Sequence, residues 1–164
     1  KYKTAPKNQS GFTLIEILIV VAIISILAIV VLAGLKPAQR LADARDARRA
    51  QDINQIITAI GECVVDKKDD SAMSDCLGSY TVGDVYEIVS GSVSSGCDAV
   101  CTGATSGSSC LALDTKLSDY FTDLPKDPKV TTTDHTGYSI TVHSNGMIVV
   151  EACGAEYGTI KVSR

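Results

Sequence analysis

The longest uninterrupted hydrophobic segment of the chain lies near its beginning. Residues 12–35 read FTLIEILIVVAIISILAIVVLAGL, and Glu16 is the one charged residue among them. A segment of this length can cross the hydrocarbon core of a bilayer as a helix. A helix that is apolar on every side also suits the interior of a helix bundle. The pattern therefore predicts a helix over residues 12–36 that faces lipid or other helices all round.

The pattern becomes amphipathic after Pro37. Ile53, Ile56, Ile57 and Ile60 recur at the spacing of one helix face, which predicts a helix with one buried stripe over residues 37–62. On the polar side, acidic residues and arginines alternate at ion-pair spacings: Asp46 with Arg49, and Arg48 with Asp52. We expect one long helix from Phe12 to Ile60, ended by Gly61.

Two residues interrupt this long helix. Gly34 and Pro37 lie between its apolar and amphipathic halves. Proline has no backbone N–H to donate, and its ring clashes with the preceding turn. The sequence therefore predicts a kink or a local opening between Gly34 and Pro37.

Strand-like patterns dominate the C-terminal half. Residues 80–89 are rich in Val, Tyr and Ile, and residues 137–143 and 147–153 flank a hairpin turn at Asn145-Gly146. A further strand is expected at 159–162, and a short helix or turn at 111–124, before Pro125 and Pro128. The fold class predicted is α+β, with the long kinked helix packed on a small antiparallel sheet of three or four strands.

All six cysteines follow the apolar segment: Cys63, Cys76, Cys97, Cys101, Cys110 and Cys153. An even number in a small domain favours disulfides in an oxidising compartment. The alternative is a zinc site using Cys97, Cys101 and Cys110, but no paired CxxC spacing supports it. We expect disulfides, with Cys63–Cys76 and Cys101–Cys110 as the local pairings.

Charge divides the chain into two parts. Residues 1–49 carry eight Lys and Arg against three acidic residues, whereas residues 50–164 carry seven against sixteen. The acidic C-terminal part argues against a nucleic-acid surface. Counting positive charges beside the apolar segment places its C-terminal side in the cytoplasm, but the cysteines argue for the opposite side, and we follow the cysteines. Interleaved with acidic residues, Arg45, Arg48 and Arg49 indicate a solvated or intersubunit helix face.

No catalytic residue is predicted. The sequence contains no GxSxG, no HExxH and no phosphate loop. The spacing of Asp123, Asp127 and Asp134 fits no EF-hand-like calcium loop. His135 and His143 are expected as surface or strand residues. We therefore expect no enzyme activity, no cofactor and no bound metal ion.

A short motif precedes the apolar segment. Residues 1–11 are polar and basic, and Gly11-Phe12-Thr13-Leu14-Ile15-Glu16 follows them without a gap. This arrangement resembles the class III signal of type IV prepilins and type II secretion pseudopilins. The resemblance implies that a prepilin peptidase and methyltransferase cuts after Gly11 and methylates the new N-terminal residue, Phe12. It also implies that Glu16 neutralises the amino terminus of Phe12 on a neighbouring subunit during assembly.

The resemblance extends weakly into the C-terminal part. Leu117, Tyr120 and Leu124-Pro125-x-Asp127-Pro128, followed by Gly137-Tyr138, are similar to a pattern in some bacterial pilin heads. The domains expected are a leader (1–11), a transmembrane and filament-core helix (12–36), its amphipathic half (37–62) and an extracytoplasmic globular head (63–164).

The function implied is structural. By resemblance, the chain is a single-pass protein of the cytoplasmic membrane that then polymerises with itself into an extracellular type IV pilus for adhesion, motility or DNA uptake. Its partners would be other copies of itself, the prepilin peptidase, the membrane, and the pilus or secretion assembly machinery, with no nucleic acid assigned. Three alternatives stay open: a type II secretion pseudopilin, a minor-pilin adhesin, and a membrane-anchored domain that never polymerises.

Overall fold

The computed structural model describes residues 11–69, 71–93, 95–101 and 109–164. Most of the expected leader, residues 1–10, lies outside the described residues. The chain divides into two compact units, Lys1–Arg40 and Leu41–Arg164. The two units are described separately below.

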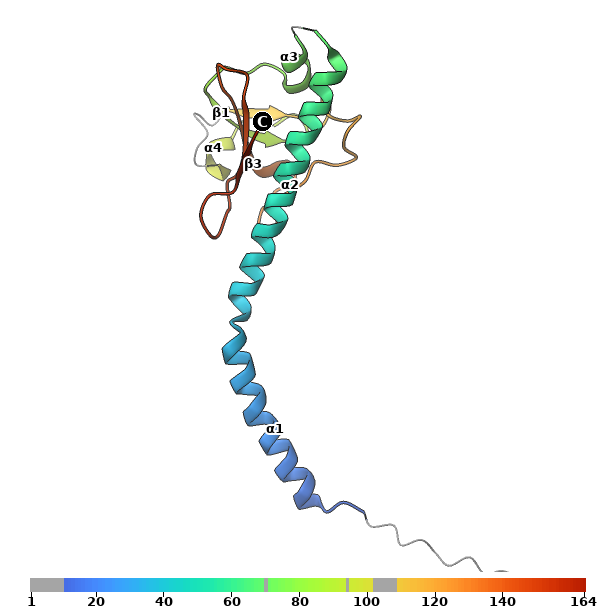
Figure 1. Ribbon diagram of the computed structural model, residues 1–164, viewed down its shortest axis with the longest axis vertical. Helices are drawn as coiled ribbons and strands as arrows, with labels where there is room; N and C mark the ends of the chain where they lie inside the picture. The colour runs from blue at the N-terminus through green and yellow to red at the C-terminus, as the bar shows by residue number, and fades with distance from the viewer. Residues whose placement is uncertain (1–10, 70, 94, 102–108) are drawn as a thin grey trace, which may run out of the picture. The chain divides into compact units, whose positions relative to one another are not determined.

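The first unit consists mainly of helix α1, Leu14–Leu35 (Figure 1). The helix continues through Gly34 and ends at Lys36, which adopts left-handed backbone angles (φ 45°, ψ 63°). Pro37 then begins the next helix. The interruption follows from Pro37, because proline disfavours the right-handed helical conformation in the residue before it and donates no hydrogen bond to the preceding turn.

Helix α2 spans Pro37–Lys67 and buries the predicted isoleucine stripe, Ile53, Ile56, Ile57 and Ile60. The expected end at Gly61 is wrong, because the helix continues for six more residues, to Lys67. Gly61 instead allows the side chain of Arg164 to lie close to the helix backbone, because a Cβ at this position would lie 3.2 Å from the guanidinium of Arg164. The helix ends where Lys68 takes a positive φ of 56°, which breaks the right-handed helical geometry.

The sheet has five strands in the order β2-β1-β3-β4-β5. Their bounds are β1 Val85–Val89, β2 Cys110–Ala112, β3 His135–Val142, β4 Ile148–Ala152 and β5 Lys161–Ser163. The pairs β1–β3, β3–β4 and β4–β5 are antiparallel, whereas β1–β2 is parallel. The α+β class is thereby confirmed, with one more strand than expected. The extra strand β2 ends within the segment 111–124 that was expected to form a helix or turn.

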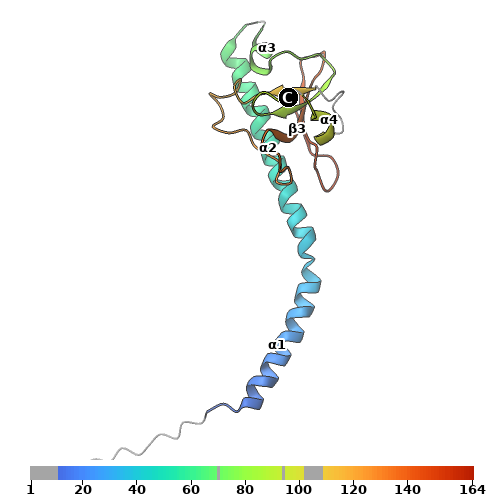
Figure 2. The same cartoon turned by 180° about the vertical axis from the view of Figure 1, so that it is seen from behind.

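The β3–β4 hairpin turns where the sequence predicted it. Gly146 adopts a positive φ of 80°, which glycine tolerates without a steric cost, and its N–H donates to the carbonyl of His143. Two short helices complete the head, α3 at Ala72–Leu77 and α4 at Cys97–Val100. In both views of the ribbon, α4 lies on the opposite side of the sheet from α2 (Figures 1 and 2).

The core lies between α2 and one face of the sheet. Ile53, Ile56 and Ile60 share one buried cluster with sheet residues such as Ile88 and Tyr138. Fully burying one such aliphatic or aromatic side chain contributes about 1.5–3 kcal/mol. Packing along this stripe explains why α2 passes Gly61 without a break.

Three disulfides hold the head, and all six cysteines take part. Cys63–Cys76 is the pairing predicted from sequence. The predicted pairing of Cys101 with Cys110 is wrong: Cys110 bonds to Cys97 and Cys101 bonds to Cys153. The parallel β1–β2 pairing explains these bonds, because it places Cys110 beside Cys97 at the start of α4. Cys101, just after α4, then bonds to Cys153, just after β4.

Candidate functional site

The first candidate site is the beginning of α1. Thr13 is the N-cap residue, and its hydroxyl oxygen accepts a hydrogen bond from the backbone N–H of Glu16 at 3.3 Å. The Glu16 carboxylate accepts in return from the Thr13 backbone N–H and from the Thr13 hydroxyl, each at 2.9 Å. This reciprocal arrangement is a capping box, which satisfies N–H groups that the first turn leaves free.

Glu16 and Phe12 are both accessible to a partner molecule. Phe12 is 84% exposed, and Glu16 is exposed one helical turn further along. In the hydrogen bonds of the described residues, the carboxylate of Glu16 is held by Thr13 and not by Phe12. A cut after Gly11 creates a positively charged amino group at Phe12, directly before the residue that Glu16 already contacts.

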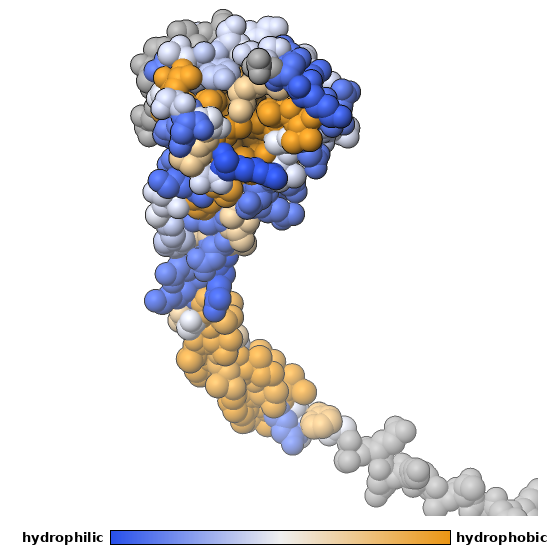
Figure 3. All heavy atoms as spheres, turned by 45° about the horizontal axis from the view of Figure 1, so that its top comes forward, coloured by the Kyte–Doolittle hydropathy of each residue, from blue (hydrophilic) through white to orange (hydrophobic). Residues whose placement is uncertain are grey.

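The surface of α1 is apolar on all sides. None of its residues is buried, and exposed large hydrophobic side chains run along its whole length. Figure 3 shows them on one face of the helix. Its 22 residues span about 33 Å at the standard helical rise, close to the thickness of a bilayer core. Among the described residues, α1 is the one helix long and apolar enough to cross a membrane. This property is consistent with membrane anchoring of the chain.

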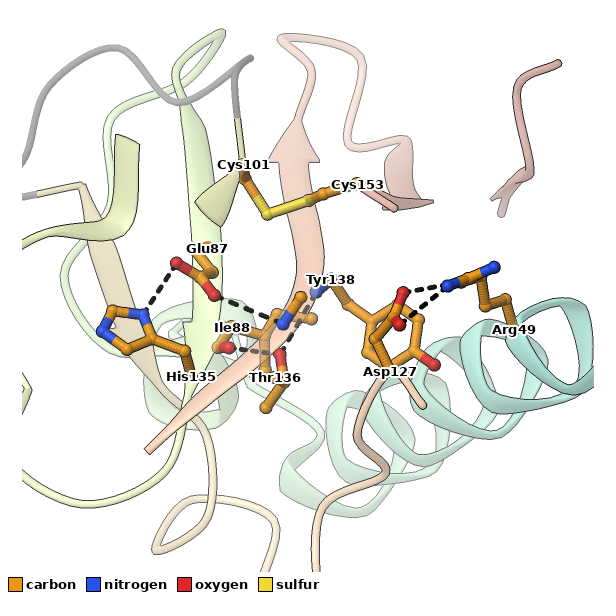
Figure 4. The surroundings of a disulfide bond; sticks show 10 residues. Arg49, Glu87, Ile88, Cys101, Asp127, His135, Thr136, Tyr138 and Cys153 are labelled. Carbon is orange, nitrogen blue, oxygen red and sulfur yellow. Dashed lines mark hydrogen bonds and ion pairs between the residues drawn. A yellow bond between two sulfur atoms is a disulfide. The ribbon is translucent and has the colours of Figure 1, made fainter. Parts of the chain in front are cut away.

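The second candidate site is a group of ion pairs that holds loops against α2. Arg49 is fully buried, and two of its nitrogens donate to Asp127: Nε to Oδ2 at 2.6 Å and Nη2 to Oδ1 at 2.8 Å (Figure 4). Its remaining nitrogen, Nη1, donates to Asp46 at 2.7 Å and to Glu156 at 3.2 Å. A paired carboxylate on each side offsets the cost of burying the guanidinium.

Glu156 connects this group to the surface. Its carboxylate accepts from Arg45 at 2.5 and 2.8 Å and pairs with Lys129 at 3.0 Å. The hydrogen bonds from Arg45, followed by those from Lys129 and Arg49, hold the pKa of Glu156 well below its usual value of 4.5. Glu156 therefore stays ionised in mildly acidic solution, and the loop that carries it stays attached to α2.

The prediction of an exposed arginine face is correct for Arg48 and wrong for Arg49. Arg48 is 66% exposed and lies 3.9 Å from Asp52, whereas Arg49 is buried. Sequence reasoning missed the partner Asp127, which lies 78 positions away along the chain.

Two glycines, Gly137 and Gly154, are the sequence features most closely connected with the buried position of Asp127. A Cβ at Gly137 would lie 2.9 Å from the Cβ of Asp127, and one at Gly154 would lie 2.7 Å from its Oδ2. Both positions leave room for the carboxylate only because they carry no side chain. Asp127 and Gly137 thus pack directly against each other in this structure.

Comparison with known proteins concerns the first site. Residues 6–32 match the model of the prokaryotic N-terminal methylation motif. No curated protein and no solved structure matches the chain. The motif is typical of type IV pilins and pseudopilins, which are not usually enzymes, and it implies processing by a prepilin peptidase. Together with the exposed apolar helix α1, it shows that the amino-terminal part of the chain is prepilin-like and carries a prokaryotic N-terminal methylation motif.

Proposed function

We propose that the chain is the structural subunit of a type IV pilus-like filament. It is inserted into the cytoplasmic membrane by α1, cut after Gly11, methylated at Phe12, and polymerised with other copies of itself outside the membrane. The observation that carries the proposal is the surface of α1, which is apolar all round and carries a single carboxylate, Glu16, at its amino-terminal end.

Leaving the membrane exposes this helix unless it finds an equivalent apolar environment. The side chains of α1 are all exposed in the single chain. Each large aliphatic side chain that moves from water to an apolar contact contributes about 1.5–3 kcal/mol. A bundle of α1 helices from neighbouring subunits provides these contacts, which supports a homopolymer as the product.

Glu16 determines how neighbouring α1 helices align along the bundle. A carboxylate at the centre of a membrane costs about 2.5–3.5 kcal/mol on insertion scales, and such groups are commonly paired or functional. Glu16 lies in the first turn of α1, where the cost is smaller but a partner still stabilises the charge. The amino group of Phe12 on a neighbouring subunit is a suitable partner, and it becomes a free cation only after the cut behind Gly11. Assembly therefore depends on processing.

The head suits a place outside the cell. Three disulfides close loops within it, and the Arg49–Asp127 pair fastens a loop to α2. Disulfides persist in oxidising, extracytoplasmic surroundings. The head thereby forms a stable unit around the filament core, for use in adhesion, motility or DNA uptake.

The test is mass spectrometry of filaments sheared from cells. We expect an N-terminal peptide that begins with methylated Phe12. Replacing Glu16 with Ala should leave the cut intact and reduce filament yield at least tenfold. Ser25→Ala is the matched control, because the Ser25 hydroxyl bonds to the carbonyl of Val21 within α1, and its yield should equal that of the wild type.

Two results would contradict the proposal. Recovery of the uncut chain alone, in membranes, would show that the chain is not processed. A wild-type filament yield from Glu16→Ala would show that the carboxylate is not needed for assembly. Short assemblies confined to the periplasm, with the same methylated Phe12, would instead identify a secretion pseudopilin.

A further inference from the structure

Four side chains with metal-binding atoms meet on the sheet face that α2 does not cover. Glu87 on β1 is opposite Cys110 on β2 in the parallel register, so both side chains leave the same face of the sheet. Cys97 begins α4 and bonds to Cys110. His135, the first residue of β3, points toward Glu87 (Figure 4).

Three of these side chains, those of Glu87, Cys97 and His135, are close together and shielded from solvent, and Cys110 is joined to Cys97 by the disulfide. His135 Nδ1 lies 3.0 Å from Glu87 Oε2, and one ligand atom each of Glu87, Cys97 and His135 lies within 4.8 Å of the others. Glu87 and Cys97 are fully buried, and the His135 side chain is 16% exposed. The second oxygen of Glu87 accepts from the backbone N–H of Gly137 at 3.3 Å, which orients the carboxylate toward His135.

One ligand pair, His135 and Glu87, already has nearly the spacing of a tetrahedral zinc site, and the two sulfurs, which are bonded to each other here, move apart on reduction. With bonds of about 2.0 Å to nitrogen or oxygen and 2.3 Å to sulfur, neighbouring ligand atoms lie about 3.3–3.8 Å apart. The distance of 3.0 Å between His135 Nδ1 and Glu87 Oε2 is close to this range. The hydrogen bond between Gly137 and the other oxygen of Glu87 supplies the outer contact that orients a ligating carboxylate.

We propose that the head has a zinc site made of Cys97, Cys110, His135 and Glu87, which is formed when the Cys97–Cys110 disulfide is reduced. A phosphine or thiol reductant supplies two electrons, and water two protons, which convert the disulfide into two thiols. Zn²⁺ then displaces both thiol protons and is held by two thiolates, one imidazole and one carboxylate. The disulfide and the metal are alternatives, and each ties the start of α4 to β2.

The other two disulfides lack these additional ligands. Within the part of the chain that the structure describes, no group of three or more potential ligands includes Cys63, Cys76, Cys101 or Cys153. The proposed site is therefore specific to one cysteine pair, and the Cys63–Cys76 pair, with the same sequence separation of 13, is a matched control.

The test uses the full chain in detergent with Co²⁺ as a spectroscopic probe for zinc. A phosphine reductant is used, because it converts disulfide and water into two thiols and phosphine oxide without adding competing thiols. We expect the reduced chain to bind one Co²⁺ with the intense visible bands of a tetrahedral thiolate complex, and Zn²⁺ to displace it. The oxidised chain should show no such bands.

Variants distinguish Co²⁺ binding at this site from Co²⁺ binding to other thiols of the reduced chain. His135→Ala and Glu87→Gln should each weaken Co²⁺ binding at least tenfold, and Cys97→Ser with Cys110→Ser should abolish the thiolate bands. Cys63→Ser with Cys76→Ser should leave both the affinity and the bands unchanged.

The proposal is overturned by any of three results. These are the absence of tetrahedral bands in the reduced wild type, equal affinity in His135→Ala, and loss of the bands in the Cys63/Cys76 control. Equal affinity in His135→Ala is informative even if reduction unfolds the head, because it would show that Co²⁺ binds to unstructured thiols.

Discussion

The buried ion pair between Arg49 and Asp127 allows a quantitative prediction. Replacing Arg49 with Met keeps an unbranched apolar side chain but removes the guanidinium. The Asp127 carboxylate then has no cation beside it. Removing one partner of a buried pair costs about 3–5 kcal/mol, because the remaining charge stays desolvated. Lys129 offers only its backbone N–H to Asp127, at 2.8 Å, so we expect little compensation.

The matched control is Arg48→Met on the next position of the same helix. Arg48 is 66% exposed and its nearest carboxylate, on Asp52, is 3.9 Å away. Pairs of this kind contribute about 0–1 kcal/mol. The two variants therefore differ in the burial of the arginine and in the number of carboxylates that lose a partner, three for Arg49 and one for Arg48.

The assay is unfolding of the full chain in detergent with its disulfides intact, followed by near-UV circular dichroism. Arg49→Met should lose about 3–5 kcal/mol of unfolding free energy, which lowers the melting temperature of a head of this size by about 10–20 °C. Adding Asp127→Asn to Arg49→Met should recover part of this loss, because no unpaired charge is then buried. A loss below about 1 kcal/mol, equal to that of Arg48→Met, would refute the reasoning.

Three further predictions concern the same region. Gly154→Ala should destabilise the head by about 1–3 kcal/mol in the same unfolding assay, because its Cβ would lie 2.7 Å from Asp127 Oδ2; unchanged stability would mean that the loop moves freely. Tyr138→Phe should lose about 1–3 kcal/mol, because it removes the donor to the buried Asp52 carboxylate at 2.7 Å, and an unaltered denaturation midpoint would argue against this bond. The depressed pKa of Glu156 stabilises the fold above its usual pKa of 4.5, and this stabilisation is lost as pH falls toward the lower folded value. Midpoints of wild type and Glu156→Gln should therefore differ at pH 7 and converge in acid, and a difference independent of pH would contradict this assignment.

Local patterns were sufficient for the two long helices and the hairpin, but not for the short helices α3 and α4. The length of the continuous apolar segment predicts α1, the isoleucine stripe of α2 expresses helical periodicity directly, and Asn145-Gly146 favours a tight turn by its own backbone preferences. The break beside Pro37 follows in the same way from one missing N–H. The end of α2 was not predictable from Gly61 alone, because packing of the stripe against the sheet outweighs the weak helix propensity of one glycine.

The N-terminal motif is likewise local, so Gly11, Phe12 and Glu16 are recognisable from the sequence without knowledge of the fold. The contacts between distant segments are different. The partner of Arg49, the pairing of Cys97 with Cys110, and the approach of His135 to Glu87 each depend on how strands order and align in the sheet. A parallel β2 at the edge brings Cys110 beside Glu87, and no spacing along the chain encodes that neighbour.

The linear sequence thus determines the elements that rest on short-range periodicity and on single residues with restricted backbones. The tertiary structure decides which charges are buried and which cysteines meet, since both depend on the desolvation and proximity that arise when segments far apart in the chain pack together.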